Sequence, residues 1–442
     1  MKTVLITSFH VLISRNILAA PFLRHLTGRG GIRAVLAVPR RKVDFFAAAF
    51  GGERVVVEGL GRNPQACDRF LQDLSAAALS TRTLALKAAA GLGPSGAARA
   101  AAAVLGRRIR AVRWLDRTLT PRGRFAKLLS RYRPDAVFAT DVFSAMDIRL
   151  MHEARDRGRP VLGMVRSWDN PTAKGLLRVV PDLLAVNSQT VAEELIRLHA
   201  VPRGRIRVVG VPHYDRYRTG PAVRRAAFLA GLGLDPERRL VLYAPTGDRY
   251  LTANSVDRDI IEILSQTLPP THHLLVRLPP ADSVNLTGLP DLANVTVERP
   301  GEHLALDPEV FKANELTPAD DERLVASLVY ADLVVCGPTT VSIDAAVFDR
   351  PIILVAFDGR GTRPYGESVR RYYDYDHMAP LLASGGAKVA RSPRELEEWV
   401  GRYLRNPELD RGGRGRIVAA ECGRLDGRSS QRLAAALAEL VP

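Results

Sequence analysis

The chain has 442 residues, of which 46% are apolar and 25% charged, and its formal net charge is +16. This length exceeds one ordinary hydrophobic core, so we expect two domains, and no apolar run approaches the roughly 20 residues that a membrane-spanning helix needs. The three cysteines are scattered (Cys67, Cys336 and Cys422), which argues against a disulfide framework and a zinc site and favours a reducing cytosol.

The first half of the chain alternates apolar runs with helical patterns. The opening MKTVLITSF predicts a strand rather than a signal peptide. Helical spacing follows at residues 13–26, 145–158 and 190–201, and further apolar runs lie at 32–38, 54–60, 135–141, 160–165, 182–187 and 206–211. Short β-branched runs separated by helices indicate parallel strands with crossover helices.

A basic, alanine-rich segment interrupts this alternation. Residues 76–106 are rich in alanine and predict helix. Residues 97–133 hold eleven Lys or Arg and one acid, Asp116, a balance of +10. Such a surface favours an anionic partner, whether nucleic acid, phosphorylated substrate or acidic lipid, and a solvated face on an arginine-rich chain is the alternative.

The alternation pauses after Pro212 and restarts near residue 237. The second half repeats it with strands at 239–246, 272–280, 294–301, 332–336 and 351–358, and with helices at 257–268, 321–330, 341–348, 392–406 and 429–440. We therefore expect an N-terminal domain over 1–212, a linker over 213–236 and a C-terminal domain with closing helices over 237–442. Ligands of such open sheets bind at the carboxyl ends of the strands, so polar residues there are the candidates for function.

Two strands of the second half end in polar turns. VLYAPTGDR places Thr246, Gly247, Asp248 and Arg249 after one strand, where hydroxyl and backbone N–H groups can hold a phosphate or simply form a turn. HLLVRLPP places Arg277 at the end of the next strand. Its guanidinium suits a phosphate, with an ion pair inside the domain as the alternative.

The motif GPTTVSID carries the strongest signal. A buried strand runs into Pro338, Thr339 and Thr340, which open a helix. We expect Thr339 to cap that helix and its free N–H groups to seat a phosphate. Asp344, four residues beyond Thr340 on the same helix face, is then a candidate for binding sugar hydroxyls such as a ribose diol. A capped helix without a ligand is the alternative.

In the first half, His10, Asp141 and Asp169 follow predicted strands. Each is a candidate base for an acceptor hydroxyl, and each is also a common turn or cap residue. The stretch SWDNPTAKG adds Trp168 as a stacking face and Asn170 and Lys174 as donors, unless Asp169 and Asn170 form an Asx turn. His213 and Tyr214 lie at the domain junction and are further ligand candidates.

Other chemistries lack their motifs. Neither G-x-G-x-x-G after a strand nor G-x-x-x-x-G-K-[ST] occurs, which disfavours dinucleotide oxidoreductases and P-loop enzymes. Without an Asp-x-Asp at a strand end, we expect no metal site, no divalent-cation requirement and no cofactor.

The segments LYAPT, VRLPP and DERLVASLVYADLVVCGPTTVSIDAAVFDRPII resemble the C-terminal half of GT-B glycosyltransferases. Within that fold, the chain is most similar to CDP-glycerol glycerophosphotransferases and related bacterial surface-polysaccharide enzymes, over roughly residues 160–435. The family typically carries His-Gly-Thr-Pro and Arg-x-His-Pro stretches, where this chain reads SWDNPTAKG and RLPP. The resemblance implies two Rossmann-like domains facing across a cleft, with the donor diphosphate near Thr246, Arg277, Thr339 and Thr340.

The expected function is a metal-independent glycosyltransferase that uses a nucleotide-sugar donor to build a cell-surface polysaccharide or glycolipid. A CDP-glycerol-type alditol phosphate transferase, a sugar-nucleotide epimerase and a non-catalytic binding protein on the same fold are the alternatives. The acceptor would be a saccharide or a lipid-linked chain, and nucleic acid is not an expected partner. The expected location is the cytoplasm, with segment 97–133 docking on anionic lipid at the inner face of the membrane.

Overall fold

The computed structural model describes residues 1–28, 31–61, 65–248, 251, 255–280, 282–303 and 314–441. Two compact units divide these residues. Unit 1 comprises Met1–Arg216 and Glu421–Pro442, and unit 2 comprises Tyr217–Ala420. Within the described residues, no helix is both long and apolar enough to cross a membrane.

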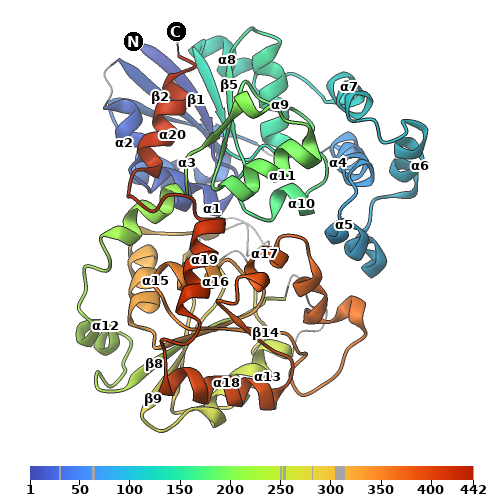
Figure 1. Ribbon diagram of the computed structural model, residues 1–442. Helices are drawn as coiled ribbons and strands as arrows, with labels where there is room; N and C mark the ends of the chain where they lie inside the picture. Colours follow the sequence, from blue (N-terminus) through green and yellow to red (C-terminus); the bar gives the residue numbers. More distant parts are fainter. Residues whose placement is uncertain are drawn as a thin grey trace. The chain divides into compact units, whose positions relative to one another are not determined.

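Unit 1 is built on a seven-stranded parallel sheet, as its alternating sequence predicts (Figure 1). The strand order is β3-β2-β1-β4-β5-β6-β7. The strands are β1 (Lys2–Thr7), β2 (Ile32–Pro39), β3 (Val55–Leu60), β4 (Ala136–Ala139), β5 (Val161–Met164), β6 (Leu183–Val186) and β7 (Ile206–Val208). The order reverses between β1 and β4, which makes the carboxyl edge of these two strands the switch point where ligands of open sheets bind.

Helices cover both faces of this sheet, which is why its strands read as continuous apolar runs. Leu5 and Val137 point to one face, and Ile6 and Phe138 to the other. One face packs against α8 (Ala126–Tyr132), α9 (Ala145–Arg155) and α11 (Gln189–His199). The opposite face packs against α2 (Phe22–Thr27), α3 (Val43–Phe50) and α20 (Ser429–Ala438).

The helical pattern at residues 13–26 forms three short pieces rather than one helix. It comprises the end of α1 (Val11–Ile13), a π-helical stretch over Ser14–Leu18, and α2. Pro21 lies between the last two pieces. Because proline has no N–H and its ring clashes with the preceding turn, it disfavours a continuous straight helix through this position.

Residues 66–119 form a helical insertion between β3 and β4. It contains α4 (Ala66–Ala78), α5 (Arg82–Lys87), α6 (Gly96–Val104) and α7 (Ile109–Leu119), seen at the right of Figure 1. These helices share a small apolar cluster that includes Leu71, Leu74 and Val112 and that Leu176, from outside the insertion, joins. The alanine-rich segment is therefore helical, as the sequence predicts, and its packing is now defined.

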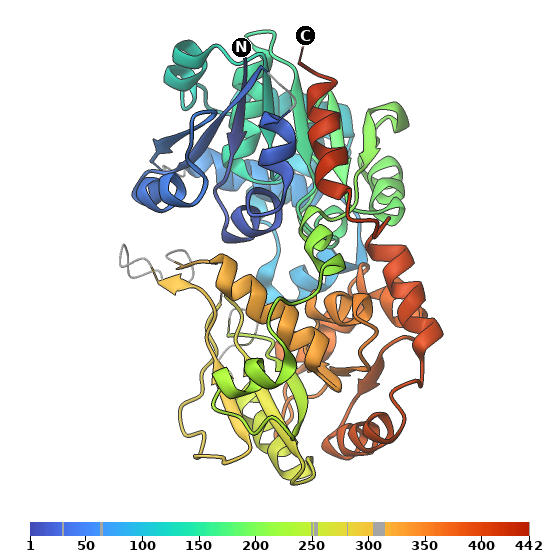
Figure 2. The same cartoon turned by 90° about the vertical axis from the view of Figure 1, so that its left-hand side faces the viewer.

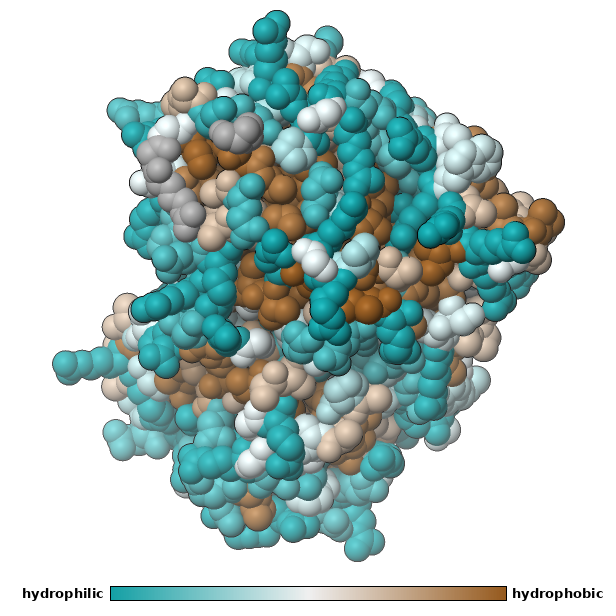
Figure 3. All heavy atoms as spheres, turned by 45° about the horizontal axis from the view of Figure 1, so that its top comes forward, coloured by the Kyte–Doolittle hydropathy of each residue, from teal (hydrophilic) through white to brown (hydrophobic). Residues whose placement is uncertain are grey.

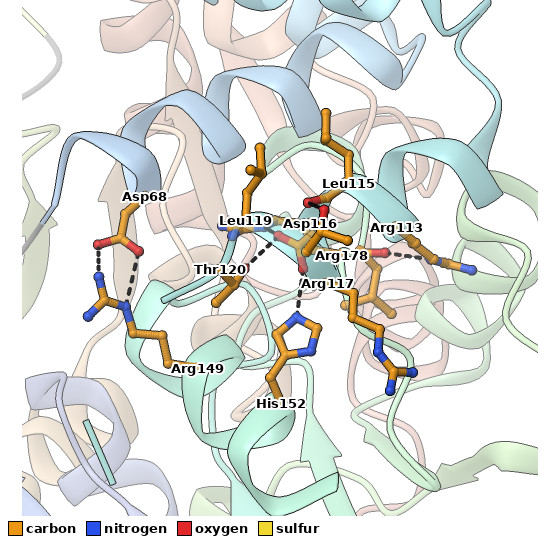
Figure 4. A network of polar contacts seen from close by, with 12 residues as sticks. Asp68, Arg113, Leu115, Asp116, Arg117, Leu119, Thr120, Arg149, His152 and Arg178 are labelled. Atoms are coloured by element: carbon orange, nitrogen blue, oxygen red, sulfur yellow. Dashed lines mark hydrogen bonds and ion pairs between the residues drawn. The ribbon is translucent and has the colours of Figure 1, made fainter. Parts of the chain in front are cut away.

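Two buried ion clusters attach this insertion to the rest of unit 1 (Figure 4). In α4, Asp68 accepts from Arg149 of α9, with Oδ2 2.5 Å from Nη2. In α7, Asp116 accepts from Arg178 Nε at 2.6 Å and pairs with His152 Nε2 at 2.8 Å. Burial opposes ionisation, but the hydrogen bonds and charges of His152 and Arg178 outweigh it and hold the pKa of Asp116 below its ordinary value.

Unit 2 is built on a six-stranded parallel sheet of order β10-β9-β8-β13-β14-β15. Its strands are β8 (Arg239–Ala244), β9 (His272–Arg277), β10 (Val295–Glu298), β13 (Leu333–Cys336), β14 (Ile352–Val355) and β15 (Lys388–Ala390), and β11 (Glu302–His303) pairs separately with β12 (Asn314–Glu315). Its helices are α12 (Arg225–Gly231), α13 (Val256–Thr267), α15 (Pro318–Tyr330), α16 (Val341–Val347), α17 (Met378–Ala383), α18 (Pro393–Arg405) and α19 (Arg411–Glu421). The sequence predicts five of these six strands and misses β15, which has only three residues.

The closing helix belongs to unit 1, so the expectation that residues 237–442 form one domain is wrong for the last 22 residues, 421–442. Figures 1 and 2 show α20, in red, beside α2 on one face of the seven-stranded sheet. Leu433 and Leu437 of α20 are fully buried in the core on that face. The sequence shows that α20 is amphipathic, but it does not show which of the two sheets buries the apolar side of the helix.

Candidate functional site

The three candidate bases of unit 1 follow neighbouring strands. His10 comes after β1, Asp141 after β4 and Asp169 after β5, and β1, β4 and β5 are adjacent in the sheet. The three residues therefore follow the carboxyl ends of adjacent strands, on and beside the switch point. Their catalytic roles stay predictions.

His10 and Asp141 both have local structural partners. His10 precedes α1, and its Nδ1 accepts from the backbone N–H of Leu12 at 3.1 Å. Asp141 is 8% exposed. Its Oδ2 accepts from Arg166 Nε at 2.8 Å, and its Oδ1 accepts from Phe143 N–H at 3.2 Å. Arg166 thus places a positive charge beside the Asp141 carboxylate at the carboxyl end of β4.

A second carboxyl, Asp147, lies behind Asp141 and has no local sequence signal that marks it as part of a site. It is fully buried in the first turn of α9, where its Oδ1 accepts from Thr7 Oγ1 at 2.5 Å and from Asp141 N–H at 3.3 Å. Thr140 completes the group by donating from its hydroxyl to Thr7 O at 2.9 Å. Burial, followed by the negative charge of Asp141, raises the pKa of Asp147 to about 7.

The stretch SWDNPTAKG forms a polar turn into a single-turn helix, α10 (Asn170–Ala173). Trp168 is 7% exposed and Asn170 is fully buried. Asn170 Nδ2 donates to Asp169 Oδ1 at 3.3 Å. Asp169 occupies the N-cap position, but its side chain makes no capping hydrogen bond, so the alternative of an Asx turn does not explain this residue pair.

Side chains from outside α10 bind the carbonyl groups that this short helix leaves unpaired. His199 bonds to Pro171 O at 2.8 Å and Thr81 to Thr172 O at 2.8 Å. In the same way Lys87 binds Ala173 O at 3.0 Å, and Gln72 binds Lys174 O at 2.7 Å. The last carbonyls of a helix have no partner within it, so these four donors fix the orientation of α10. Three of them come from the helical insertion.

Close packing also explains the glycine that ends this stretch. Gly175 has φ +85°, and a Cβ there would lie 2.7 Å from Ser75 Oγ and from Ala76 N of α4. Only glycine accepts that conformation and that approach without strain. A glycine that follows a proline-containing turn is a sequence signal for a tight backbone conformation. The sequence does not show that α4 is the helix packed against it.

His213 is buried in a 3₁₀ turn over Pro212–Arg218. Its Nε2 lies 2.5 Å from Arg15 Nη2. Burial, and then the charges of Arg15 and Arg216, lower the pKa of His213 well below its ordinary value. The ring is therefore neutral and accepts the hydrogen bond from Arg15 through Nε2. Tyr214 beside it is also buried.

In unit 2, the turn after β8 is organised by Asp257, the second residue of α13. Its Oδ1 accepts from Thr246 N–H at 2.9 Å and from the hydroxyl of Tyr243 at 2.7 Å. Its Oδ2 accepts from Gly247 N–H at 3.0 Å. The backbone N–H groups of Thr246 and Gly247, which are expected from the sequence to hold a phosphate, are thus bound by a carboxylate of the chain itself.

The same turn is tightly packed around two glycines. Gly247 has φ +93°, and a Cβ there would lie 2.5 Å from Asp282 Oδ2. A Cβ on Gly337 would lie 2.2 Å from Thr246 Oγ1, so the turns that follow the neighbouring strands β8 and β13 touch. Arg249, the last residue of the VLYAPTGDR motif, lies outside the described residues.

Arg277 makes the ion pair that the sequence left as an alternative. It is 8% exposed, its Nη1 donates to Glu298 Oε2, and its Nη2 donates to Asp320 O at 2.8 Å. Glu298 ends the neighbouring strand β10. A partner 21 residues away that is brought into contact by the sheet cannot be recognised from local sequence.

The GPTT turn joins β13 to α16, as expected, but the capping differs. Thr340, not Thr339, occupies the N-cap position, and neither side chain makes a capping hydrogen bond there. Pro338 and Thr339 are half-buried and Thr340 is exposed. Asp344 is buried in the first turn of α16, where its Oδ1 accepts from the hydroxyl of Tyr217 at 3.0 Å. Tyr217 is a contact of this motif that the sequence did not indicate.

An arginine- and tyrosine-rich loop follows β14, the strand next to β13. Asp358 shapes it by accepting from Ser368 Oγ and Val369 N–H, both at 2.9 Å. The stretch DGRGTRPYGESVRRYYDYD is conspicuous in the sequence, but it matches no known ligand-binding motif that would have marked it as part of a site. Among the described residues, no group of three or more His, Cys, Asp or Glu side chains is placed to hold a metal ion.

Two parallel α/β units, each with polar turns at the carboxyl edge of its sheet, give this chain the GT-B fold. A family model described as CDP-glycerol:poly(glycerophosphate) glycerophosphotransferase matches residues 164–439. Because this match spans more than half of the chain, the chain belongs to that family. A search of curated proteins found no match.

Solved structures with the same fold include three proteins of different function. They are UDP-GlcNAc 2-epimerase from Neisseria meningitidis bound to UDP-GlcNAc (TM-score 0.55, 12% identity, 99% of this chain and 100% of that chain), the glycotransferase of kitacinnamycin (0.55, 13%, 100% and 99%) and the wall teichoic acid polymerase TagF (0.52, 10%, 99% and 88%). At such identities the likeness establishes the fold, while the family match identifies a transferase.

Proposed function

We propose that this protein transfers a group from a nucleotide-activated donor to a growing cell-surface polymer or glycolipid. The match to the glycerophosphotransferase family over residues 164–439 carries the proposal. The matched range includes all of the donor-side motifs in unit 2 and the SWDNPTAKG stretch in unit 1. The related structures of a teichoic acid polymerase and a glycotransferase agree with a transfer reaction.

The leading donor is a nucleotide-linked sugar. This chain has SWDNPTAKG and RLPP where enzymes of the family typically have histidine motifs, so the groups used for glycerol phosphate transfer differ here. A CDP-linked alditol is the second candidate, because the family is described by CDP-glycerol itself. A structure of the same fold with bound UDP-GlcNAc supports the nucleotide-sugar reading.

In the proposed reaction, the two units have different tasks. The turns after β8 and β13 and Asp344 would hold the donor, and Asp169, Asp141 or His10 would take the proton of the acceptor hydroxyl. The leaving diphosphate needs neutralisation, which threonine hydroxyls and arginines such as those of the loop after β14 can supply. We therefore expect turnover to persist in EDTA.

A donor panel tests the proposal. Thermal unfolding of the whole protein is followed with UDP-, GDP-, CDP- and TDP-linked sugars and with CDP-glycerol, and each donor that stabilises is then tested for turnover with EDTA present. We expect one nucleotide sugar to raise Tm. Because Asp344 is expected to bind the ribose hydroxyls, Asp344→Asn should lower the affinity for that donor at least tenfold, which is about 1.4 kcal/mol of binding free energy. Tyr217→Phe, which keeps the carboxylate, should weaken it less.

The matched control is Glu397→Gln, an exposed acid of α18 in the same unit, which should leave donor affinity unchanged. Stabilisation by CDP-glycerol alone would replace the sugar donor with an alditol phosphate. A panel without any stabilising donor would contradict the transferase and favour a non-catalytic binding protein. Conversion of the donor to an epimer without an acceptor would identify an epimerase.

A further inference from the structure

The helical insertion exposes large apolar side chains, although most such residues of the described chain are buried. Val104 is 87% and Trp114 is 65% exposed, and Leu92 and Leu119 are exposed as well. At the right-hand edge of Figure 3, where α6 lies in Figure 1, brown surface is bordered by hydrophilic side chains. Exposed apolar side chains that are bordered by polar ones are typical of interaction sites.

Helix α7 has one inward and one outward face. Val112 and Asp116, four residues apart, are buried. Arg110, Trp114 and Arg117 are exposed at spacings of four and three residues, so they share the opposite face. The indole is thus flanked by a guanidinium on each side along the helix.

The buried cluster at Asp116 fixes this orientation. Asp116 is 1% exposed and is bound to Arg178 and His152, which lie outside the insertion. In addition, Arg113 of α7 donates to Leu177 O at 3.0 Å and to His199 O at 2.6 Å. Because α7 cannot rotate without breaking these contacts, Trp114 stays on the outside.

The arginines of the outward face make no ion pair with any acid that the structure describes. Among the described residues, no ion pair forms at Arg108, Arg110 or Arg117, whereas Arg122 and Arg131 pair with Asp156 and Glu58. The one acid of segment 97–133, Asp116, is buried. The outward positive charge is therefore left for a partner with negative charge.

We propose that this face is a docking surface for an anionic lipid bilayer, formed by Val104, Arg107, Arg108, Arg110, Trp114 and Arg117. Trp114 would lie at headgroup depth, where an indole offers an apolar body and a polar N–H, and the arginines would bind lipid phosphates. The inference goes beyond the proposed function and does not depend on it, since the surface belongs to the insertion and uses none of the candidate site residues.

Two other partners fit the surface less well. A second copy of the chain would bring the same arginines against one another, and their repulsion opposes such a pairing. A duplex nucleic acid would satisfy the arginines but would offer no apolar partner for Val104. A bilayer supplies phosphate and apolar depth together.

Vesicle co-sedimentation tests the proposal. The whole protein is mixed with vesicles of phosphatidylcholine alone or of phosphatidylcholine and phosphatidylglycerol in equal parts. We expect binding to the anionic vesicles that weakens with salt, and little binding to neutral ones. Since each basic residue at such a surface contributes about fivefold, the triple variant R108Q/R110Q/R117Q should lose at least tenfold in affinity. The matched control R203Q/R391Q/R394Q removes three exposed charges elsewhere and should lose little.

Tryptophan emission gives a second readout on the same samples. Trp114 is the exposed one of the three tryptophans, Trp168 being buried and Trp399 half-buried. Emission should shift to the blue on anionic vesicles in the wild type and not in Trp114→Phe. Equal affinities of the two triple variants, or absence of wild-type binding to anionic vesicles, would overturn the proposal. So would a short DNA duplex that binds more tightly than the vesicles and depends on the same three arginines.

Discussion

Asp147 makes the stability of unit 1 depend on pH. Its pKa rises from an ordinary 3.8 to about 7 on folding, so the native chain keeps a proton that the unfolded chain releases. The stabilisation is complete below the ordinary pKa and is lost as pH rises towards 7. Asp147→Asn lacks this dependence, so between about pH 4 and pH 8 the variant should gain up to about 4 kcal/mol relative to the wild type.

Urea unfolding across that pH range measures the effect as a difference between the two proteins. The difference cancels groups of opposite sign, such as His199, whose pKa is lowered to about 4 by its burial and whose contribution is lost as pH falls below 6.5. Asp44→Asn, an exposed acid of α3, serves as the control and should follow the wild type. Parallel curves for Asp147→Asn and wild type would show that Asp147 is ionised in the native state.

At the scale of single residues, the sequence located strand-end positions well and their partners poorly. His10, Asp141, Asp169, Thr246 and Thr339 follow strands as expected because the alternation of strands and helices is a local pattern. Asp147 was missed because its hydrogen-bond partner Thr7 lies 140 residues away in the chain. Glu298, the partner of Arg277, was missed for the same reason. Packing partners come from topology, which a single sequence does not display.

At the scale of elements, α10 depends on donors from other helices. Gln72 Nε2 donates to Lys174 O at 2.7 Å, and its removal leaves that carbonyl unpaired. We expect Gln72→Leu to destabilise unit 1 by about 1–2 kcal/mol. If α10 positions a catalytic residue, turnover should fall while donor affinity, a property of unit 2, stays unchanged.

Gln189→Leu is the matched control. Gln189 also donates a hydrogen bond from its side-chain amide, to Glu193 at 3.2 Å on the exposed face of α11. The loss of this bond should change neither the stability of unit 1 nor turnover. A decrease of donor affinity in Gln72→Leu would mean that α10 acts on the donor rather than on the acceptor. Unchanged turnover together with the loss of stability would make the contact purely structural.

At the scale of the whole molecule, the chain starts and ends in unit 1, and unit 2 is inserted between them. Asp215 lies one residue before the chain leaves unit 1. It binds the first turn of α20, which follows the return of the chain to unit 1 at Glu421. Its Oδ1 accepts from Ser429 N–H at 2.8 Å and its Oδ2 from Ser430 N–H at 2.7 Å. A carboxylate at a helix N-terminus pairs free donors and complements the helix dipole.

We expect Asp215→Ala to destabilise unit 1 by about 1–2 kcal/mol, because two buried N–H groups lose their acceptor. Asp215→Asn keeps one acceptor oxygen, so its stability should lie between those of the wild type and Asp215→Ala. Calorimetry of the whole protein is the measurement, with a stabilising donor added to identify the transition of unit 2. Asp215→Ala should lower the temperature of the unfolding transition that the donor does not shift. A shift confined to the donor-sensitive transition would instead mean that α20 stabilises unit 2, and the assignment of residues 421–442 to unit 1 would fail.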